Sequence, residues 1–150
     1  MSAYEQQHQT TFGGETAPPE QRGNCYAACI AMLLGIDVAL VPNFVAAEDH
    51  VEAAAAWLSE RGVLLWCFPS DPLEPVPEWR SRATMIASGM TPRGHMHAVL
   101  WRDGELLLDP HPSGIGLSGE PETYEVLVIA DPACFRRWLA DAEMSRRRGS

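Results

Sequence analysis

Cys25 stands in the stretch RGNCYAACIAMLLGI, residues 22–36, directly after Gly-Asn and at the expected start of an apolar helix. The N–H groups at a helix start and the helix dipole stabilise negative charge, so a thiol there gains thiolate character. Cys29, Cys67 and Cys134 lie within apolar segments, where a cysteine is expected to pack as a small hydrophobic residue. Cys25 is therefore the candidate nucleophile.

Two possible partners of this thiol lie in the stretch HMHAVLWRDGELLLDPHP, residues 95–112. A cysteine hydrolase needs a histidine to accept the thiol proton and a third polar group to orient the imidazole. If residues 102–104 form a three-residue turn with the glycine left-handed, His97 lies directly opposite Asp109, and the carboxylate faces Nδ1 of the ring. A two-residue turn at 103–104 would move Asp109 to the other face of the sheet, and the sequence permits both turns.

The same stretch allows a second interpretation, a metal site. His95, His97, Asp109 and His111 could share one face across two paired strands, and their side chains suit a transition metal. That interpretation leaves the position of Cys25 unexplained. His111 also stands between two prolines and is expected beyond the end of the strand. The main prediction contains no metal and no cofactor.

The candidate nucleophile would be positioned by a helix that begins near Asn24. Apolar residues recur at i, i+4, i+7, i+8 and i+11 from Cys25 to Ile36, which is the spacing of one helix face. Asn24 is suited to the N-cap and Gly35 to the C-terminal stop. Residues 1–23 are polar and contain Gly-Gly and Pro-Pro, so we expect an extended arm there.

The histidine and the aspartate would be positioned by a β-sheet in the second half of the chain. A second helix is expected at about 48–61, and the apolar segment 63–68 predicts a buried strand. The proline-rich segment 69–79 predicts a surface loop. Further strands are expected at 83–88, 96–101, 105–109 and 124–130, then an amphipathic helix at about 132–146 and a frayed tail at 145–150. Helices followed by mostly antiparallel strands predict one α+β domain over residues 1–150.

The composition excludes some classes of function. The chain has 150 residues and a formal net charge of -9, with 11 Lys and Arg against 20 Asp and Glu, which is unlike a nucleic-acid-binding surface. An apolar run long enough to cross a membrane and the features of a signal peptide are both missing from the sequence, so we expect a cytoplasmic protein. The four cysteines contain no CxxC pair, and free thiols are expected.

The motifs resemble those of a known family. GNCYAAC at 23–29, followed by HAVLW and then DPHPSG, is similar to papain-like cysteine hydrolases, and most like the C39-type peptidases that process bacteriocins. Short phage and bacterial proteins carrying QTTFG…GNC and SPRG…HAV…DPHP are also similar. Residues 9–13 match the first of these motifs, and residues 91–94 match SPRG in the form TPRG.

The resemblance implies a papain-like α+β fold, with an N-terminal catalytic helix packed on a mostly antiparallel sheet. It implies Cys25 as the nucleophile, His97 as the general base and acid, and Asp109 as the orienting carboxylate. In the family a glutamine upstream of the cysteine completes the oxyanion hole. Gln9 is preferred for that role here, because Gln21 has too little chain to turn back across the helix start; Gln21 remains the alternative.

The resemblance also implies a cysteine peptidase or amidase that cleaves an amide, peptide or isopeptide bond through an acyl-thioester. The expected partner is a peptide or amide-containing substrate, without nucleic acid or membrane, and the sequence leaves the oligomeric state open. A non-catalytic binding module of the same fold is the alternative from another functional class.

Overall fold

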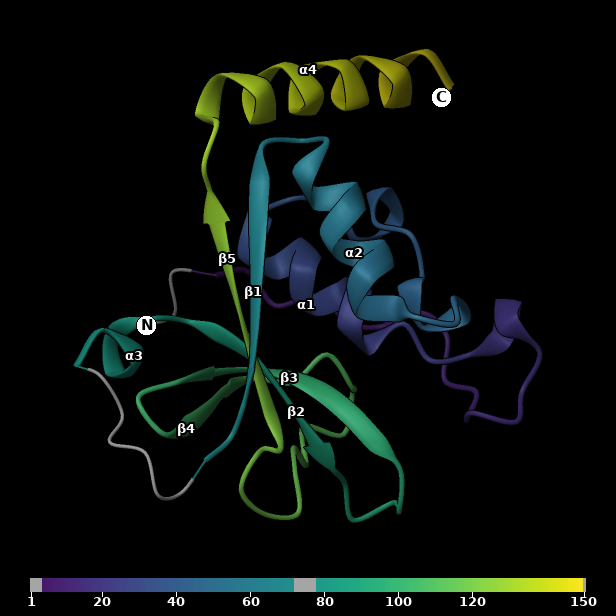
Figure 1. Cartoon of the computed structure of the whole chain (residues 1–150). Helices are drawn as coiled ribbons and strands as arrows, with labels where there is room; N and C mark the ends of the chain where they lie inside the picture. The colour runs from purple at the N-terminus through teal and green to yellow at the C-terminus, as the bar shows by residue number, and fades with distance from the viewer. Residues whose placement is uncertain (1–3, 72–77, 150) are drawn as a thin grey trace.

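A computed structural model of the chain describes residues 4–71 and 78–149. Within these residues, five strands form a single sheet in the order β1-β5-β2-β3-β4, and every neighbouring pair is antiparallel (Figure 1). The strands are β1 Val63–Pro69, β2 Met85–Met90, β3 Met96–Arg102, β4 Glu105–Leu108 and β5 Thr123–Ile129. The helices are α1 Cys25–Leu34, α2 His50–Ser59, α3 Glu78–Arg82 and α4 Pro132–Gly149, with short 3-10 turns at η1 Pro19–Gln21, η2 Val38–Leu40 and η3 Phe44–Ala46. The expected α+β class is confirmed.

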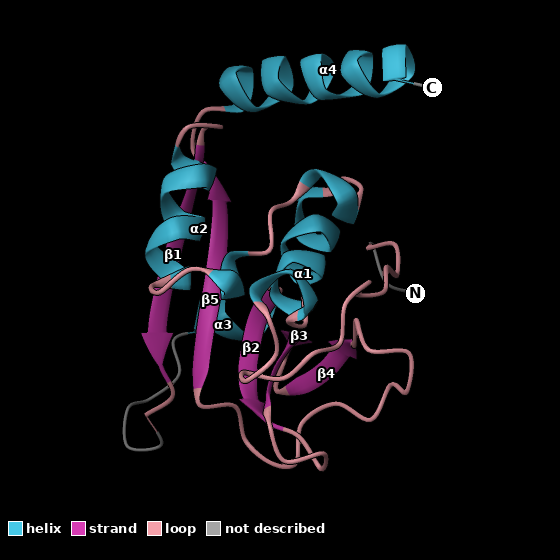
Figure 2. Ribbon diagram, turned by 90° about the vertical axis from the view of Figure 1, so that its right-hand side faces the viewer, coloured by secondary structure: helices cyan, strands magenta, loops and turns pink. Residues whose placement is uncertain are grey.

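The sheet carries its two longer N-terminal helices on one face. Figure 2 shows α1 and α2 over the same side of the strands, where α1 contacts β2 and β3 and α2 contacts β1. Ile30 of α1 and Leu58 of α2 belong to one buried cluster with Ile86 and Leu100 of the sheet. Burial of this cluster removes apolar side chains from water and holds α1 against the strands.

Helix α1 lies deeper in the core than one apolar face would require. Seven of its ten residues are buried, because the sheet covers one side and the segments that contain η2 and η3 contact it as well. Its alanines let these neighbours approach closely. The helix stops at Gly35, whose φ of 67° is left-handed, as its position in the sequence predicts.

The side chain of Asn24 departs from the predicted capping role. Asn24 stands at the N-cap position, but among the described residues its side chain bonds to the N-terminal arm and makes no cap hydrogen bond to α1. Its Oδ1 accepts from the N–H groups of Thr10 and Thr11 at 2.8 and 3.1 Å, and its Nδ2 donates to Thr10 Oγ1 at 2.9 Å. The arm is therefore fastened to the start of α1, and the first N–H groups of the helix are left to other partners.

The arm also reaches the end of β4. The N–H of Gln9 donates to the carbonyl of Pro110 at 2.9 Å, and the Gln6 side chain donates to the carbonyl of Asp109 at 2.9 Å. One extended segment thus joins the start of α1 to the residues that follow β4. Apart from η1 and an isolated bridge between Gly13 and Arg22, the described part of this segment has no regular structure, as predicted.

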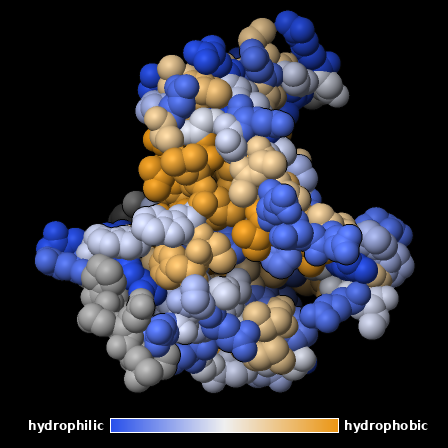
Figure 3. Space-filling model, in the orientation of Figure 1, coloured by the Kyte–Doolittle hydropathy of each residue, from blue (hydrophilic) through white to orange (hydrophobic). Residues whose placement is uncertain are grey.

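The prediction that β1 is a buried strand is wrong. β1 lies at the edge of the sheet and only its α2 face is covered, so Leu64 and Trp66 are 55% and 61% exposed. Leu64 pairs with Val128 of β5, which is also exposed. Figure 3 shows hydrophobic side chains gathered below α4, over one end of β1 and β5.

Two other expectations differ from the structure near the ends of segments. Residues 69–79 were expected to form a loop, but Glu78 and Trp79 begin α3. The Trp79 ring stacks on the Trp66 ring, with 6.1 Å between the ring centroids. Residues 72–77 lie outside the described residues. The tail at 145–150 was expected to fray. Instead α4 continues to Gly149, and Arg146 forms an ion pair with Asp37 at 3.0 Å.

Helix length bears on membrane insertion. Within 4–71 and 78–149, no single helix is both long and apolar enough to cross a membrane. The pair formed by Cys25–Leu34 and Val38–Ala46 meets the length and composition criteria together, but it bends by 109° at its break.

Candidate active site

The β3–β4 hairpin decides whether His97 and Asp109 can meet. Its turn has two residues, Asp103 and Gly104, with φ of 53° and 75°, and Arg102 pairs with Glu105. Of the two turns that the sequence permits, the structure therefore has the shorter one, and the left-handed Gly104 is confirmed.

An irregularity in the ladder compensates for the shorter turn. Trp101 pairs with Leu106, but Leu100 pairs with Leu108, so a bulge leaves Leu107 without a paired partner in the register. One extra residue moves everything after it to the opposite face of the sheet. Asp109 consequently returns to the face that carries His97, as a diagonal rather than a direct neighbour.

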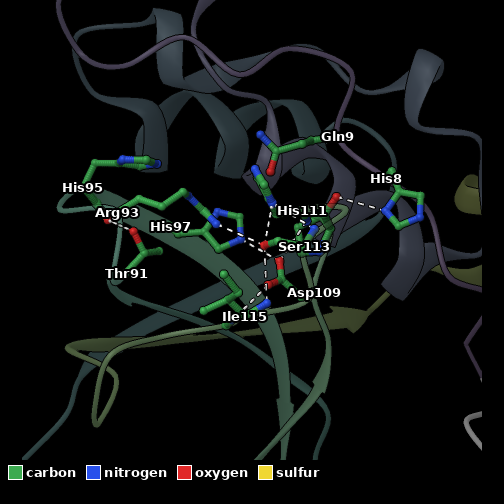
Figure 4. A network of polar contacts seen from close by, with 12 residues as sticks. His8, Gln9, Thr91, Arg93, His95, His97, Asp109, His111, Ser113 and Ile115 are labelled. Atoms are coloured by element: carbon green, nitrogen blue, oxygen red, sulfur yellow. Dashed lines mark hydrogen bonds and ion pairs between the residues drawn. The ribbon is translucent and has the colours of Figure 1, made fainter.

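His97 and Asp109 form a buried pair. His97 Nε2 lies 2.7 Å from Asp109 Oδ1, and both side chains are 2% exposed (Figure 4). Burial alone would lower the pKa of His97, but hydrogen bonds with Asp109 and Cys25 raise it to about 9. The imidazole is therefore protonated at neutral pH and carries a positive charge beside the thiol.

The Asp109 carboxylate is held from several sides. Besides His97, the N–H of His111 donates to Oδ1 and the N–H of Gly116 donates to Oδ2, each at 2.8 Å. Burial alone would raise the pKa of Asp109, but these hydrogen bonds outweigh it and keep the pKa below its usual range. A fixed, ionised carboxylate therefore orients the His97 ring.

The ring nitrogen that contacts Asp109 differs from the expected one. The carboxylate approaches from the diagonal position along the strand and bonds to Nε2, not to Nδ1. Nδ1 is then the ring nitrogen left for Cys25, whose thiol is close enough to raise the pKa of His97. The three predicted side chains thus meet in the order Cys25, His97, Asp109.

Cys25 is the first residue of α1 and is partly exposed, whereas Cys29, one turn later, is fully buried. Burial raises the pKa of the Cys29 thiol well above its usual range, so this cysteine is an inert core residue. Cys25 has the helix N-terminus, the His97 imidazolium and access to a cavity. These are the conditions under which a thiol becomes a nucleophile.

Of the two glutamines proposed for an oxyanion hole, Gln9 lies at the site. It lines the same cavity as Cys25, and its Nε2 donates to the carbonyl of Thr11 at 2.8 Å. That nitrogen carries a second hydrogen, and Gln9 Oε1 is buried without a hydrogen-bond partner among the described residues. Gln21 is exposed in η1 and is not among the residues that line the cavity.

The histidines of the alternative metal site do not form a set of ligands in the described residues. The Nδ1 of His111 is hydrogen-bonded to Ser113 Oγ at 2.8 Å, and Ser113 also accepts from Arg93 (Figure 4). His97 is hydrogen-bonded to Asp109. His95 is exposed, just before β3. Across the described residues, no three His, Cys, Asp or Glu side chains are grouped closely enough to hold a metal ion.

A cavity of about 610 Å³ opens beside Cys25 and His97. Its lining includes a carboxyl group that the sequence interpretation missed, Glu125 of β5, which is 3% exposed and accepts a short hydrogen bond from the hydroxyl of Tyr26. Burial raises the pKa of Glu125. A charged residue inside the apolar segment YEVLVIA was the only signal in the sequence that pointed to this position.

Comparison of the chain with protein-family models, with curated proteins and with solved structures finds no match. The site is therefore interpreted from its own geometry.

The charge of Asp109 is expected to control the protonation of His97. In Asp109→Asn the side chain keeps its shape but loses its charge, so the pKa of His97 should fall from about 9 by roughly 1 unit or more. An NMR titration of the His97 ring measures this shift. Asp103→Asn, in the exposed hairpin turn, is the matched control and should leave the His97 titration in place. An unchanged midpoint in Asp109→Asn would contradict the pairing.

Proposed function

We propose that the protein is a papain-like cysteine hydrolase that cleaves an amide, peptide or isopeptide bond. The observation that carries this proposal is the chain of contacts from Cys25 at the start of α1 to His97 and on to buried Asp109. The helix-first order, the antiparallel sheet behind α1 and the position of Gln9 also support it. No cofactor is required.

In the proposed reaction, the Cys25 thiolate attacks the carbonyl carbon, and the oxyanion accepts hydrogen bonds from the backbone N–H of Cys25 and from Gln9 Nε2. His97 gives its proton to the leaving nitrogen, the C–N bond breaks, and an acyl-thioester remains on Cys25. His97 then takes a proton from water, which attacks the thioester and releases the acid and the thiolate. Asp109 keeps Nδ1 of His97 directed at the sulfur.

A binding module of the same fold is the second candidate. It is favoured by the size of the cavity beside Cys25, which could hold a peptide without turnover. The two candidates differ in what they require of the thiol, because only the hydrolase needs it to be activated. For the compartment we propose the cytoplasm, where the four free cysteines would stay reduced.

Selective alkylation separates the two candidates. At neutral pH, one equivalent of iodoacetamide is expected to modify Cys25 at least about tenfold faster than the other thiols, because only Cys25 has an imidazolium beside it. Peptide mass spectrometry over time measures each site. Cys67 is the matched comparison, since it is exposed but its pKa is raised by burial and by Glu125. Slow, uniform labelling of all accessible thiols would favour the binding module.

A further inference from the structure

Glu125 occupies a position where a carboxyl group is costly. It lies in the middle of β5, on the face of the sheet that packs against α1, and is 3% exposed. Moving an ionised carboxylate out of water into such a place destabilises the fold unless its oxygens find donors. Each of the two oxygens of Glu125 therefore needs a hydrogen-bond donor.

The two oxygens have different surroundings. Oε2 accepts the hydroxyl of Tyr26, and this bond ties the first turn of α1 to the sheet. Oε1 has no hydrogen-bond partner among the described residues, yet it is not sealed inside the protein, because Glu125 borders the cavity and Oε1 is reachable from it. One acceptor of a nearly buried carboxyl group thus faces the space beside Cys25.

Among the described residues, no ion pair brings a cation to this acceptor. The neighbours of Glu125 that line the cavity are Cys67, which is its partner across the β1–β5 ladder, and the Ser88–Thr123 pair next to it. Throughout the described residues, the ion pairs join other side chains and none includes Glu125. A ligand that brings positive charge and N–H donors would complete the site.

The contact between Tyr26 and Glu125 indicates the length of a ligand that could join Cys25 and Glu125. Tyr26 follows Cys25 directly, and its side chain spans the distance from the start of α1 to Glu125. A lysine or arginine side chain has a similar length. β2 separates β5 from β3, which carries His97, so a group bound at Glu125 lies away from the histidine that must protonate the leaving nitrogen.

We propose that Glu125 is a specificity residue that binds the lysine or arginine side chain of the residue whose carbonyl carbon Cys25 attacks. This inference rests on the proposed hydrolase function and narrows its substrates to bonds that follow a basic residue. Charged N–H groups of the substrate donate to Glu125 Oε1, while Tyr26 continues to hold Oε2. The interaction forms at a residue that is only 3% exposed, so solvent screens it weakly.

Paired affinity labels test this proposal without a known substrate. N-acetyl-lysyl and N-acetyl-norleucyl chloromethyl ketones differ in the amine, and the arginyl and citrullinyl reagents form a second pair. In each case the Cys25 thiolate attacks the methylene carbon and chloride leaves. Mass spectrometry gives the rate at Cys25. We expect each basic reagent to react at least about tenfold faster than its neutral partner, the size of one charged hydrogen bond.

The variants assign this preference to Glu125. Glu125→Gln keeps the shape and an acceptor for Tyr26 but loses the charge, so the basic-to-neutral ratio should fall to about 1. Glu122→Gln makes the same change on an exposed side chain outside the cavity and should keep the ratio. Because each ratio is taken within one variant, a change in Cys25 reactivity cancels.

The possible outcomes separate this proposal from the function on which it rests. Rapid reaction of Cys25 with equal rates for basic and neutral reagents, or a preference that survives in Glu125→Gln, would overturn the role of Glu125 alone. Preference within only one pair would support the proposal and identify lysine or arginine as the residue bound. If all four reagents modify Cys25 no faster than Cys134, the thiol is not activated, and the proposed hydrolase fails together with the inference.

Discussion

Cys25→Ala is expected to abolish hydrolysis, with a loss of about 10⁴-fold or more, while the protein still folds. The acyl-thioester cannot form without the sulfur, and the rest of the site contributes only binding and orientation. Peptide and amide libraries incubated with the wild-type protein and with Cys25→Ala provide the measurement: the wild type releases products, and the variant retains intact substrate that can be identified by mass spectrometry.

Cys29→Ala is the matched control, because it removes the same atom one turn deeper in α1. Cys29 is fully buried, so its loss should leave a small cavity and lower the free energy of unfolding by about 1–2 kcal/mol, with hydrolysis retained. Denaturant unfolding and the library assay are run on both variants. Equal hydrolysis by the wild type and Cys25→Ala would exclude the enzyme.

His97→Ala is expected to lower the rate of hydrolysis by about 10²- to 10⁴-fold, the usual contribution of a general acid and base. It should also slow alkylation of Cys25 near pH 7. In the wild type the pKa of His97 is raised to about 9, so the imidazolium is present below that pH and is lost as the pH rises through it. The difference between the two proteins should therefore be largest near neutrality and shrink above pH 9, where ordinary thiols ionise without help.

The pH profile distinguishes loss of the imidazolium from simple disturbance of the site. His95→Ala is the control, because His95 lines the same cavity but is exposed and outside the His97–Asp109 pair. It should keep the wild-type profile. Parallel alkylation curves for the wild type and His97→Ala from pH 6 to pH 10 would contradict the role of His97. Abolition of hydrolysis by chelators would instead favour the metal interpretation.

The sequence predicts most of the elements because their signals are local. Gly35 ends α1 as expected, and the strands at 85–90, 96–102 and 123–129 lie within two residues of their predicted ranges. The periodicity of apolar side chains and the turn residues between them determine these limits. Exposure of β1 is different, because it depends on which strand lies at the sheet edge, and the strand order is a property of the whole chain.

At the candidate site, too, the features with local sequence signals could be predicted and those set by the whole chain could not. Cys25 could be singled out because a helix start has a local signature, and His97 and Asp109 because a hairpin brings them close. The bulge at Leu107 has no such signature, so the sequence leaves the turn length open and does not reveal how a two-residue turn can keep Asp109 beside His97. The His97–Asp109 contact was predicted correctly, but the ring nitrogen that makes it was not. Glu125 could not be found from spacing, since its closeness to Tyr26 comes from the packing of α1 on a strand 99 positions away.

The N-terminal arm is expected to detach at a lower free energy than the one that unfolds the core. It contributes Gln9 to the cavity, and its polar contacts reach the side chain of Asn24 at the start of α1 and the carbonyls of Asp109 and Pro110. Segments with few buried apolar contacts detach at a lower free energy than the core unfolds. Release of the arm would uncouple the helix start from the end of β4 while the sheet stayed intact. The proposed hydrolase activity would then be lost before the fold is, and the amides of the arm would exchange with solvent well ahead of those in α1.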